Sequence, residues 1–319
     1  MEVKTPLNVH WELTNVCNLH CVHCYQQDDG PRNPLPQGHD LFKIAQRIVE
    51  ARVFEVTLTG GEPLLVPQLR DLIHFFNEHD LRPHITSNGM LVDESAAQWL
   101  SEADVTFQIS IDGAAAQAHN SIRGSKQAFK RATDGIRRLV DRGVSVSISY
   151  TATPMNTAEI EPVVRLGAAL RVGRVCVGEV LPYYGSHASR EQMKFTPTTY
   201  ASFVNGLREV ATQYAGRVDV AIALMSGHQY DDTLRNAPCT ALDRDLAILH
   251  DGWAYPCPFV RSREYRLGNV ISTSIEDIWM SKTARRFREE KSAGTPKHCT
   301  VAGSPTGPVA VELLRRPPN

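Results

Sequence analysis

The sequence predicts an α/β protein, a partial (β/α)6 TIM barrel followed by a small C-terminal α+β domain. Strand and helix patterns alternate six times up to about residue 216. Such alternation implies a parallel sheet with right-handed crossovers. From there to residue 300 the alternation stops, and short strands and two helices follow. We therefore expect domains at residues 1–216 and 217–300, with a tail at 301–319.

The barrel strands are expected where runs of β-branched and apolar residues end in Gly, Asn or Asp turn signals. They cover residues 9–13, 53–58, 82–86, 105–111, 144–151 and 172–181. Between them, apolar residues recur at helical spacing. The corresponding helices are expected at residues 39–52, 66–79, 94–102, 129–142 and 158–170.

The C-terminal domain is expected to begin with a β-hairpin. Two short strand patterns, residues 246–250 and 253–257, are joined at Asp251-Gly252, a common hairpin turn. A helix follows at residues 274–279 with Ser274 as its N-cap, and another at 283–291.

Composition excludes several classes of protein. The chain has 319 residues, 42% hydrophobic and 22% charged, with a net charge of −1. Phosphate binding requires a basic surface, so nucleic acid is not an expected partner. No signal peptide or long apolar run is present in the sequence, which predicts a cytoplasmic protein without a membrane partner. In a reducing compartment, seven cysteines favour metal binding or catalysis over disulfides.

Three cysteines, Cys17, Cys21 and Cys24, follow the first predicted strand with the spacing C-x3-C-x2-C. They are too close together for a disulfide framework, but they can bind one metal centre. An iron–sulfur cube normally takes four cysteines, so three leave one iron open to a small ligand. Structural zinc usually takes two C-x2-C halves, and only one is present. The trio therefore favours an iron–sulfur cluster, with zinc as the alternative.

The second predicted strand ends in Thr59-Gly60-Gly61-Glu62-Pro63. Two glycines directly after a strand allow the backbone to approach a ligand, and its polar groups can then bind it. Glycine-rich turns are common, so this motif gains meaning only from its position one β-α unit after the cysteines.

Together, the trio and Gly60 to Pro63 resemble the radical S-adenosylmethionine (radical SAM) enzymes. The resemblance implies that Cys17, Cys21 and Cys24 hold a [4Fe–4S] cluster whose open iron binds SAM. Reductive cleavage of SAM would release a 5′-deoxyadenosyl radical, which abstracts hydrogen from an unactivated carbon. An electron donor such as flavodoxin or ferredoxin is then an expected partner.

The resemblance also places the SAM site at the carboxyl ends of the strands. Glu62 is expected to serve packing or backbone orientation rather than acid–base chemistry. Arg123 lies in His119-Asn-Ser-Ile-Arg-Gly124, similar to a family segment that usually has Asp at position 120. It could pair with the SAM carboxylate or lie on the surface. The expected SAM-site residues are Gly60, Gly61, Glu62, Ser87, Asn88, Ser110, Asp112 and Arg123.

The remaining cysteines of the C-terminal part suggest a second cluster. Cys239 and Cys257 flank the predicted hairpin, and Cys299 follows the last helix. This resembles the SPASM and twitch extensions, whose complete SPASM form carries seven cysteines and two auxiliary [4Fe–4S] clusters. Three cysteines allow one auxiliary cluster with a non-cysteine fourth ligand or an open site. The alternative is a decayed module in which they are ordinary buried thiols.

Cys176 lies apart from both groups, on the sixth predicted strand. If it points into the barrel, it could return a hydrogen atom to a substrate radical. A buried core thiol is the more common role of such a residue. Other residues expected near the substrate pocket are Tyr150, Tyr183, Tyr184 and His187.

The expected function is radical SAM modification of a ribosomal peptide by crosslinking, oxidation or epimerisation. The resemblance leaves open an epimerase or dehydrogenase acting on an aminoglycoside or another sugar. The sequence starts its barrel at about residue 8, without the leader-binding domain of many peptide maturases, which favours a small substrate or a separate recognition partner. A non-catalytic iron–sulfur electron carrier and a zinc-stabilised interaction module are the alternatives from other classes.

Overall fold

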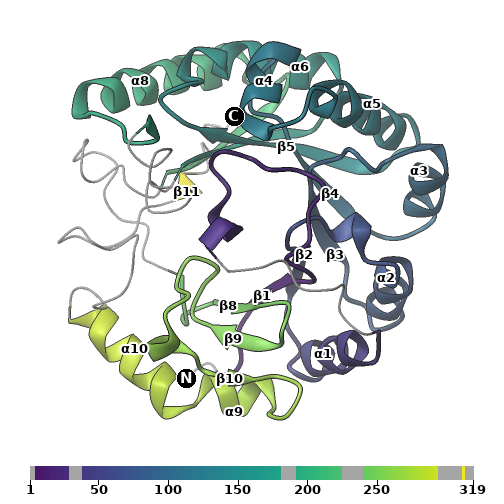
Figure 1. The fold of residues 1–319 in the computed structure, drawn as a ribbon, viewed down its shortest axis with the longest axis vertical. Coiled ribbons are helices and arrows are strands. Elements are labelled where there is room, and N and C mark those ends of the chain that lie inside the picture. The colour runs from purple at the N-terminus through teal and green to yellow at the C-terminus, as the bar shows by residue number, and fades with distance from the viewer. Residues whose placement is uncertain (1–3, 29–37, 181–191, 225–239, 294–310, 313–319) are drawn as a thin grey trace.

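Seven parallel strands form the frame of the protein in a computed structural model, which describes residues 4–28, 38–180, 192–224, 240–293 and 311–312. The parallel strands are β1 (Asn8–Glu12), β2 (Glu55–Thr59), β3 (Pro83–Ser87), β4 (Thr106–Ser110), β5 (Ser145–Ala152), β6 (Arg174–Glu179) and β7 (Asp219–Ala223). The helices between them lie outside the curved sheet (Figure 1), as in a TIM barrel. The predicted fold class is confirmed.

Five of the described barrel helices agree with the predicted ranges to within a few residues, and two had no predicted range. The helices are α1 (Gly38–Glu50), α2 (Leu69–Glu78), α3 (Glu94–Ser101), α4 (Ala116–Arg123), α5 (Ala128–Asp141), α6 (Ile160–Ala169) and α8 (Pro197–Gln213). The two without a predicted range are α8 and the short α4. Helix α4 is capped by Gly124, whose φ of 71° lies in the left-handed region that favours glycine at a helix end. Short 3-10 turns are η1 (Tyr25–Asp28), η2 (Pro63–Leu65), η3 (Thr157–Glu159) and η6 (Arg263–Tyr265).

The parallel arrangement continues beyond the point where the sequence suggested that it stops. Strand β7 follows α8 and pairs with β6 in parallel, with Cys176 opposite Ala221. Its five residues are too short a pattern to stand out from the loops around them. In the described residues, β7 thus adds a strand after the six predicted β-α units.

The C-terminal part belongs to the same sheet. Strand β8 (Asp245–Ile248) pairs in parallel with β1, and β9 (Trp253–Tyr255) and β10 (Gly268–Asn269) continue the sheet in antiparallel order. At the other edge, β11 (Val311–Glu312) pairs with β7. Helices α9 (Ile275–Trp279) and α10 (Lys282–Ser292) complete the described chain. Ser274 caps α9 as predicted, accepting a hydrogen bond from the Asp277 amide.

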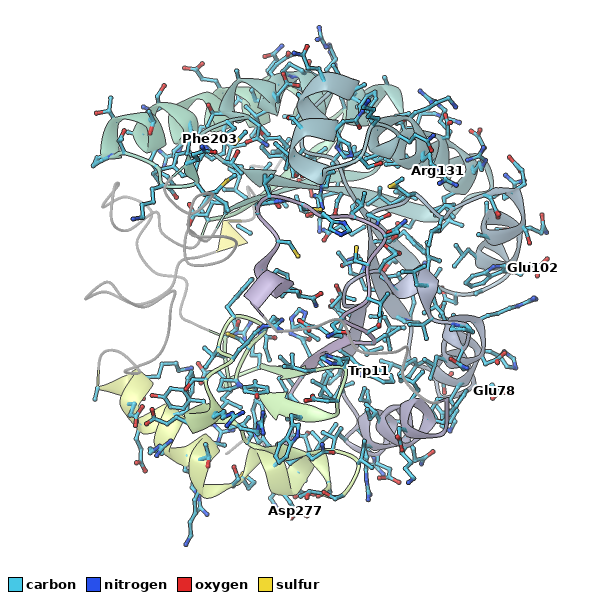
Figure 2. All side chains as sticks on the ribbon, viewed as in Figure 1. Trp11, Glu78, Glu102, Arg131, Phe203 and Asp277 are labelled. Carbon is cyan, nitrogen blue, oxygen red and sulfur yellow. The ribbon has the colours of Figure 1, made fainter. Side chains whose placement is uncertain are left out.

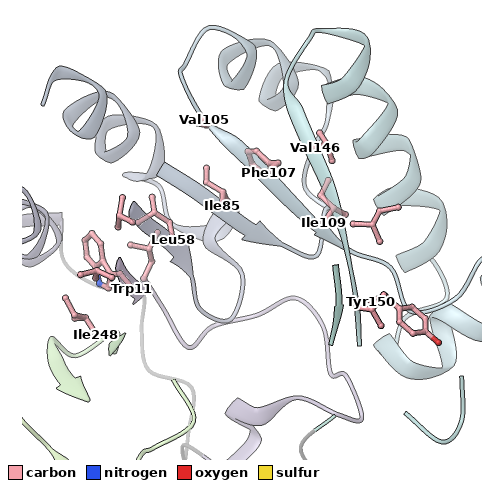
Figure 3. Close-up of a cluster of buried hydrophobic side chains, with 14 of the residues drawn as sticks. Trp11, Leu58, Ile85, Val105, Phe107, Ile109, Val146, Tyr150 and Ile248 are labelled. Carbon is pink, nitrogen blue, oxygen red and sulfur yellow. The ribbon is translucent and has the colours of Figure 1, made fainter. Parts of the chain in front are cut away.

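The outer face of the sheet forms the hydrophobic core with the helices. Figure 3 shows Leu58 on β2, Ile85 on β3, and Phe107 and Ile109 on β4 in this layer. All four are at most 1% exposed. At one end, Trp11 meets Phe76 of α2 edge to face, with ring centroids 6.5 Å apart. Truncating a buried aromatic side chain of this kind to alanine destabilises a fold by about 3 to 5 kcal/mol.

The inner face of the sheet is polar. Along β5, Val146 and Ile148 are buried outward, while Ser147, Ser149 and Thr151 occupy the alternate positions. Two cavities lie along this inner face, one at each end of the strands. Within the described residues, no helix has the length and apolar character needed to cross a membrane.

Candidate active site

The three cysteines of the predicted cluster site line one cavity of about 270 Å³ at the carboxyl ends of the strands. In Figure 1 the segment after β1, drawn in purple, arches over this end of the barrel. Cys21 is buried, and Cys17 and Cys24 are half-buried. The other lining residues are Leu19, His23, Tyr25, Thr59, Gly60, Gly61, Thr86, Ser87, Asn88, Ser110, Arg123, Ser149, Thr151, Glu179, Val180 and Phe259.

The thiols of the trio are surrounded by hydrogen-bond donors. The Leu19 amide donates a hydrogen bond to Cys17 Sγ at 3.4 Å, and Asn88 Nδ2 donates to the same sulfur at 3.9 Å. Arg123 Nη1 donates to Cys21 Sγ at 3.8 Å. Donors of this kind stabilise the thiolate forms that bind iron.

Burial has the opposite effect on the same thiols. It raises the pKa of Cys17 to about 11 and also raises the pKa of Cys21. The thiolate forms therefore need additional positive charge, which iron supplies when it binds. Among the described residues, no three His, Cys, Asp or Glu side chains are placed to share a single metal ion. A multi-iron cluster spans a larger space than one ion, and the donor-rich cavity fits such a group.

The double glycine holds the second turn against the cysteine loop. A Cβ atom on Gly60 would lie 2.3 Å from the Thr14 carbonyl oxygen, and one on Gly61 only 2.1 Å from that of Val16. The Gly61 amide donates to Thr14 O at 2.6 Å, and the Glu62 amide to Val16 O at 2.9 Å. The glycines thus allow close backbone approach between two loops, a reason that differs from the predicted approach to a ligand.

Glu62 joins the turns that follow β2 and β3. Its Oε1 accepts hydrogen bonds from Ser87 Oγ at 2.7 Å and from the Leu64 amide at 3.1 Å, and its Oε2 accepts one from the Asn88 amide at 2.8 Å. The side chain is fully buried, and burial raises its pKa despite these donors. It does not line the cavity. Glu62 was expected among the SAM-site residues, but its contacts hold the backbone of the two turns instead of facing the cavity.

Asp112 and Arg123 form a buried ion pair behind the cysteines. Arg123 Nε lies 2.6 Å from Asp112 Oδ2, and His23 Nε2 lies 3.4 Å from the same oxygen. Burial by itself would raise the pKa of Asp112, but the charge of Arg123 and the contact with His23 bring it well below its usual range. Asp112 was expected among the SAM-site residues, but it is fully buried and does not line the cavity. Arg123 does line the cavity, but its guanidinium already pairs with Asp112 and is only 9% exposed.

His119 supports this ion pair from behind. Its Nδ1 accepts a hydrogen bond from the Asp112 amide at 3.1 Å, which requires a ring nitrogen without a proton. Burial, aided by the charge of Arg123, lowers the pKa of His119 to about 4. The ring is therefore neutral at neutral pH and holds the turn after β4 in place.

Sequence reasoning missed several residues of the cavity wall. His23 and Tyr25 lie within the cysteine segment itself, and Phe259 comes from the C-terminal part. Ser149 and Thr151 could have been found, because the alternation of polar and apolar residues along β5 assigns them to the inner face. No local signal in the sequence brings Phe259 to this site.

Cys176 lies in the second cavity, at the amino ends of the strands. This cavity has a volume of about 750 Å³ and is lined by Phe54, Glu55, Arg82, His84, Thr106, Phe107, Gln108, Ser145, Val146, Ser147, Gly173, Arg174, Cys176 and Asp219. The next inward position on β6 toward the cysteines is Gly178. Because two residues of a strand span about 6.6 Å, the Cys176 thiol lies one layer below the first cavity. The structure therefore corrects the predicted hydrogen-donor position of Cys176.

Most of the other predicted residues of the C-terminal cluster and the substrate pocket lie outside the described residues. These are Cys239 and Cys299, together with Tyr183, Tyr184 and His187. Cys257 is described and half-buried, two residues after β9, where it packs against the main core. Tyr150 is fully buried on the outer face of β5, not in the cavity, and its hydroxyl donates to the Asn156 carbonyl oxygen.

The fold and the site together define an iron–sulfur enzyme whose reactive cavity lies at the carboxyl ends of a parallel barrel. Residues 11–167 match the family model of the radical SAM superfamily, and residues 239–301 match that of the SPASM iron–sulfur cluster-binding domain. The two matches together span more than half of the chain.

Relatives and solved structures agree with these matches. Mycofactocin maturase MftC of Mycobacterium tuberculosis is 27% identical over 93% of this chain and 76% of its own length. The sporulation killing factor maturation protein SkfB of Bacillus subtilis is 25% identical over 86% of this chain and 64% of its own length. The crystal structure of Streptococcus suis SuiB bound to S-adenosylmethionine has the same fold, with a TM-score of 0.77 at 17% identity over 95% of this chain and 73% of SuiB.

The chain belongs to the radical SAM superfamily, in its SPASM subgroup. It is a radical SAM enzyme, with a [4Fe–4S] cluster and SAM in the barrel and an auxiliary iron–sulfur cluster in the C-terminal domain.

Proposed function

We propose that this enzyme modifies a ribosomal peptide by removing a hydrogen atom from an unactivated carbon. The observation that carries the proposal is the similarity to peptide maturases along 93% of the chain, combined with the cavity that gathers the cysteine trio, the double glycine and the turns after β3 and β4. The solved structure of SuiB bound to its precursor peptide SuiA shares the fold, with a TM-score of 0.75.

The roles in this proposal follow from the positions of the side chains. Cys17, Cys21 and Cys24 hold the first cluster, which supplies the electron that cleaves SAM. Arg123 and Asn88 donate to two of these thiols, and the buried Glu62 and Asp112 hold those two donors in place. The SAM-facing surface is assigned to Gly60, Gly61, Ser87, Asn88, Ser110 and Arg123.

The auxiliary cluster is assigned to Cys239, Cys257 and Cys299, with a fourth ligand that is not a cysteine or is open. The boundary at residue 300 belongs to the same proposal, whereas β7 (Asp219–Ala223), which pairs with β6, carries the barrel beyond the expected boundary at residue 216. The proposed change to the peptide is crosslinking, oxidation or epimerisation. An epimerisation needs a hydrogen donor at the cavity lined by the cysteine trio, and Cys176 lies in the second cavity instead.

The cluster assignment is tested by iron and acid-labile sulfide per chain after anaerobic reconstitution. The wild type is expected to hold about eight irons, and a Cys17/Cys21/Cys24→Ala variant about four. The Cys257→Ala variant should instead lose the irons of the C-terminal site. A wild type with about four irons, and almost none in the triple variant, would overturn the auxiliary cluster assignment.

The substrate assignment is tested by the formation of 5′-deoxyadenosine. A pooled peptide library should stimulate it above the rate without substrate, and deuterium from labelled peptides should appear in 5′-deoxyadenosine. A panel of aminoglycosides serves as the matched comparison. Stimulation and deuterium transfer from the aminoglycosides alone would overturn the peptide proposal and support the sugar alternative.

A further inference from the structure

A buried carboxylate at the end of β1 connects the cysteine loop to the C-terminal domain. Glu12 is 1% exposed and is the last residue of β1, five positions before Cys17. Its Oε1 accepts a hydrogen bond from the hydroxyl of Tyr25 at 3.2 Å and pairs with the guanidinium of Arg261. A charged side chain this deeply buried is costly unless it is paired, so these contacts are needed for the site to form.

Arg261 holds the segment after Cys257 in place by three contacts. Its Nη2 donates to Glu12, its Nε donates to the Pro258 carbonyl oxygen at 2.8 Å, and its guanidinium lies over the Tyr25 ring, 4.9 Å from the centroid. The planar guanidinium can make an ion pair and stack on a ring at once, which lysine cannot do. Removing Arg261 would therefore release Tyr25 and residues 258–261 together.

The same contacts shape the cavity wall. The rings of Tyr25 and Phe259 meet edge to face, with centroids 5.7 Å apart, and both residues line the cavity that holds the cysteine trio. Tyr25 directly follows Cys24, and Phe259 lies two residues after Cys257. The two segments that carry predicted cluster ligands thus share one aromatic wall, fixed by one buried ion pair. In Figure 1 the purple η1 turn, which begins at Tyr25, lies in the barrel mouth beside the green C-terminal segment.

We propose that Glu12, Tyr25 and Arg261 form a junction that couples the C-terminal iron–sulfur site to the SAM cavity. In this junction Arg261 is a positioning residue. It places Tyr25 and Phe259 against the space where SAM and the substrate meet, and it does so only while the Cys257 segment is in its folded position. Assembly of the C-terminal site then increases the affinity of the cavity for SAM. This inference rests on the proposed assignment of Cys257 as a cluster ligand.

The test measures SAM affinity and the cluster signal rather than product. The variants are Arg261→Met, Cys257→Ala and the combination of the two, each reconstituted anaerobically. SAM dissociation constants are obtained by equilibrium dialysis, and the electron paramagnetic resonance spectrum of the reduced first cluster is recorded with and without SAM. Arg266→Met is the matched control. Arg266 also lies over an aromatic ring of the C-terminal part, Trp253 at 4.5 Å, but this ring does not line the cavity, whereas the Tyr25 ring under Arg261 does.

Arg261→Met is expected to keep the irons of the first cluster and to weaken SAM binding roughly five- to tenfold, as allosteric couplings commonly do. Cys257→Ala should weaken it by a similar factor. Both changes act through one junction. The combined variant should therefore bind SAM no more weakly than the single variant with the larger loss of affinity, and the two losses should not multiply. Arg266→Met should bind SAM as the wild type does.

The junction is overturned if Arg261→Met binds SAM like the wild type, or if the two effects multiply. If Arg261→Met alone fails to fold because Glu12 is left unpaired, the Glu12→Gln/Arg261→Met variant removes both charges and carries the same expectation. A wild type whose cluster spectrum does not change when SAM is added would instead contradict the proposed function. The two failures can therefore be told apart.

Discussion

The two ends of the barrel both contain polar cavities, but they are organised differently. The lower cavity, at the amino ends of the strands, is larger, about 750 Å³ against 270 Å³. Its charged residues form exposed pairs, such as Arg174 with Asp219 at 2.6 Å. At the upper end the carboxylates of Glu12, Glu62 and Asp112 are buried, and each is shared between two or more loops. The difference shows that buried shared polar groups, rather than cavity volume, mark the reactive end.

Alanine substitutions of two glycines give the largest expected contrast between the ends. Gly61→Ala places a Cβ 2.1 Å from the Val16 carbonyl oxygen, so the cysteine loop has to move. We expect SAM cleavage to fall by about 100-fold or more, since a shift of about 1 Å in a site can have that effect. Gly173 lines the lower cavity, and the Cβ that Gly173→Ala adds would meet nothing within 4 Å. This variant should cleave SAM at the wild-type rate in the same 5′-deoxyadenosine assay, and equal rates for the two variants would contradict the contrast.

The same substitution in two ion pairs tests the role of burial. Asp112→Asn leaves Arg123 buried without its charged partner, so the free energy of unfolding should fall by about 3 to 5 kcal/mol. Asp219→Asn removes the exposed partner of Arg174 at the lower end, and the loss should be about 0.2 to 1 kcal/mol. Urea unfolding of the two variants beside the wild type measures both values. Losses of equal size would show that burial does not make the Asp112–Arg123 pair more important for stability than the exposed pair.

Acid should weaken the upper end through His119. Its pKa is about 4 in the folded protein and 6.5 when unperturbed, so the neutral ring stabilises the fold above pH 6.5. This stabilisation is lost as the pH falls from 6.5 toward 4, because the unfolded chain takes up the proton first. The expected loss is about 1 to 3 kcal/mol. Unfolding of apoprotein between pH 7.5 and 4.5 should show a smaller slope for His119→Asn than for the wild type. Parallel slopes would exclude His119 as the cause.

The smallest effect is expected from Cys176. Because its thiol lies in the lower cavity, Cys176→Ala should form 5′-deoxyadenosine at the wild-type rate, within about twofold, which corresponds to less than 1 kcal/mol. The product from the identified substrate should also be unchanged. A product that lost stereochemical inversion in this variant would restore Cys176 as a hydrogen donor and weaken the contrast between the two ends.

Local patterns in the sequence predicted most of the fold and the residues at the strand ends. The cysteine trio, Gly60, Gly61, Ser87 and Ser110 were found because each follows a recognisable strand, and parallel strands place their carboxyl ends together. Contacts between residues far apart in the chain were not predictable in this way. Arg123 meets Cys21 across 102 positions, and Arg261 meets Glu12 across 249. The position of Cys176 along the barrel axis was not predicted either, because a strand pattern shows which face of the sheet a residue is on but not how far it lies from the strand ends.

The parallel pairing of β8 with β1 has a consequence for how this protein is made. Asn8 donates a hydrogen bond to Asp245 across 237 positions of the chain, so β1 gains this neighbour only after β8 has been synthesised. Until then β1 has an unpaired edge directly beside the cysteine segment, and such edges favour association with other chains. A nascent chain that stalls before β8 would leave its metal-binding loop attached to an unfinished sheet.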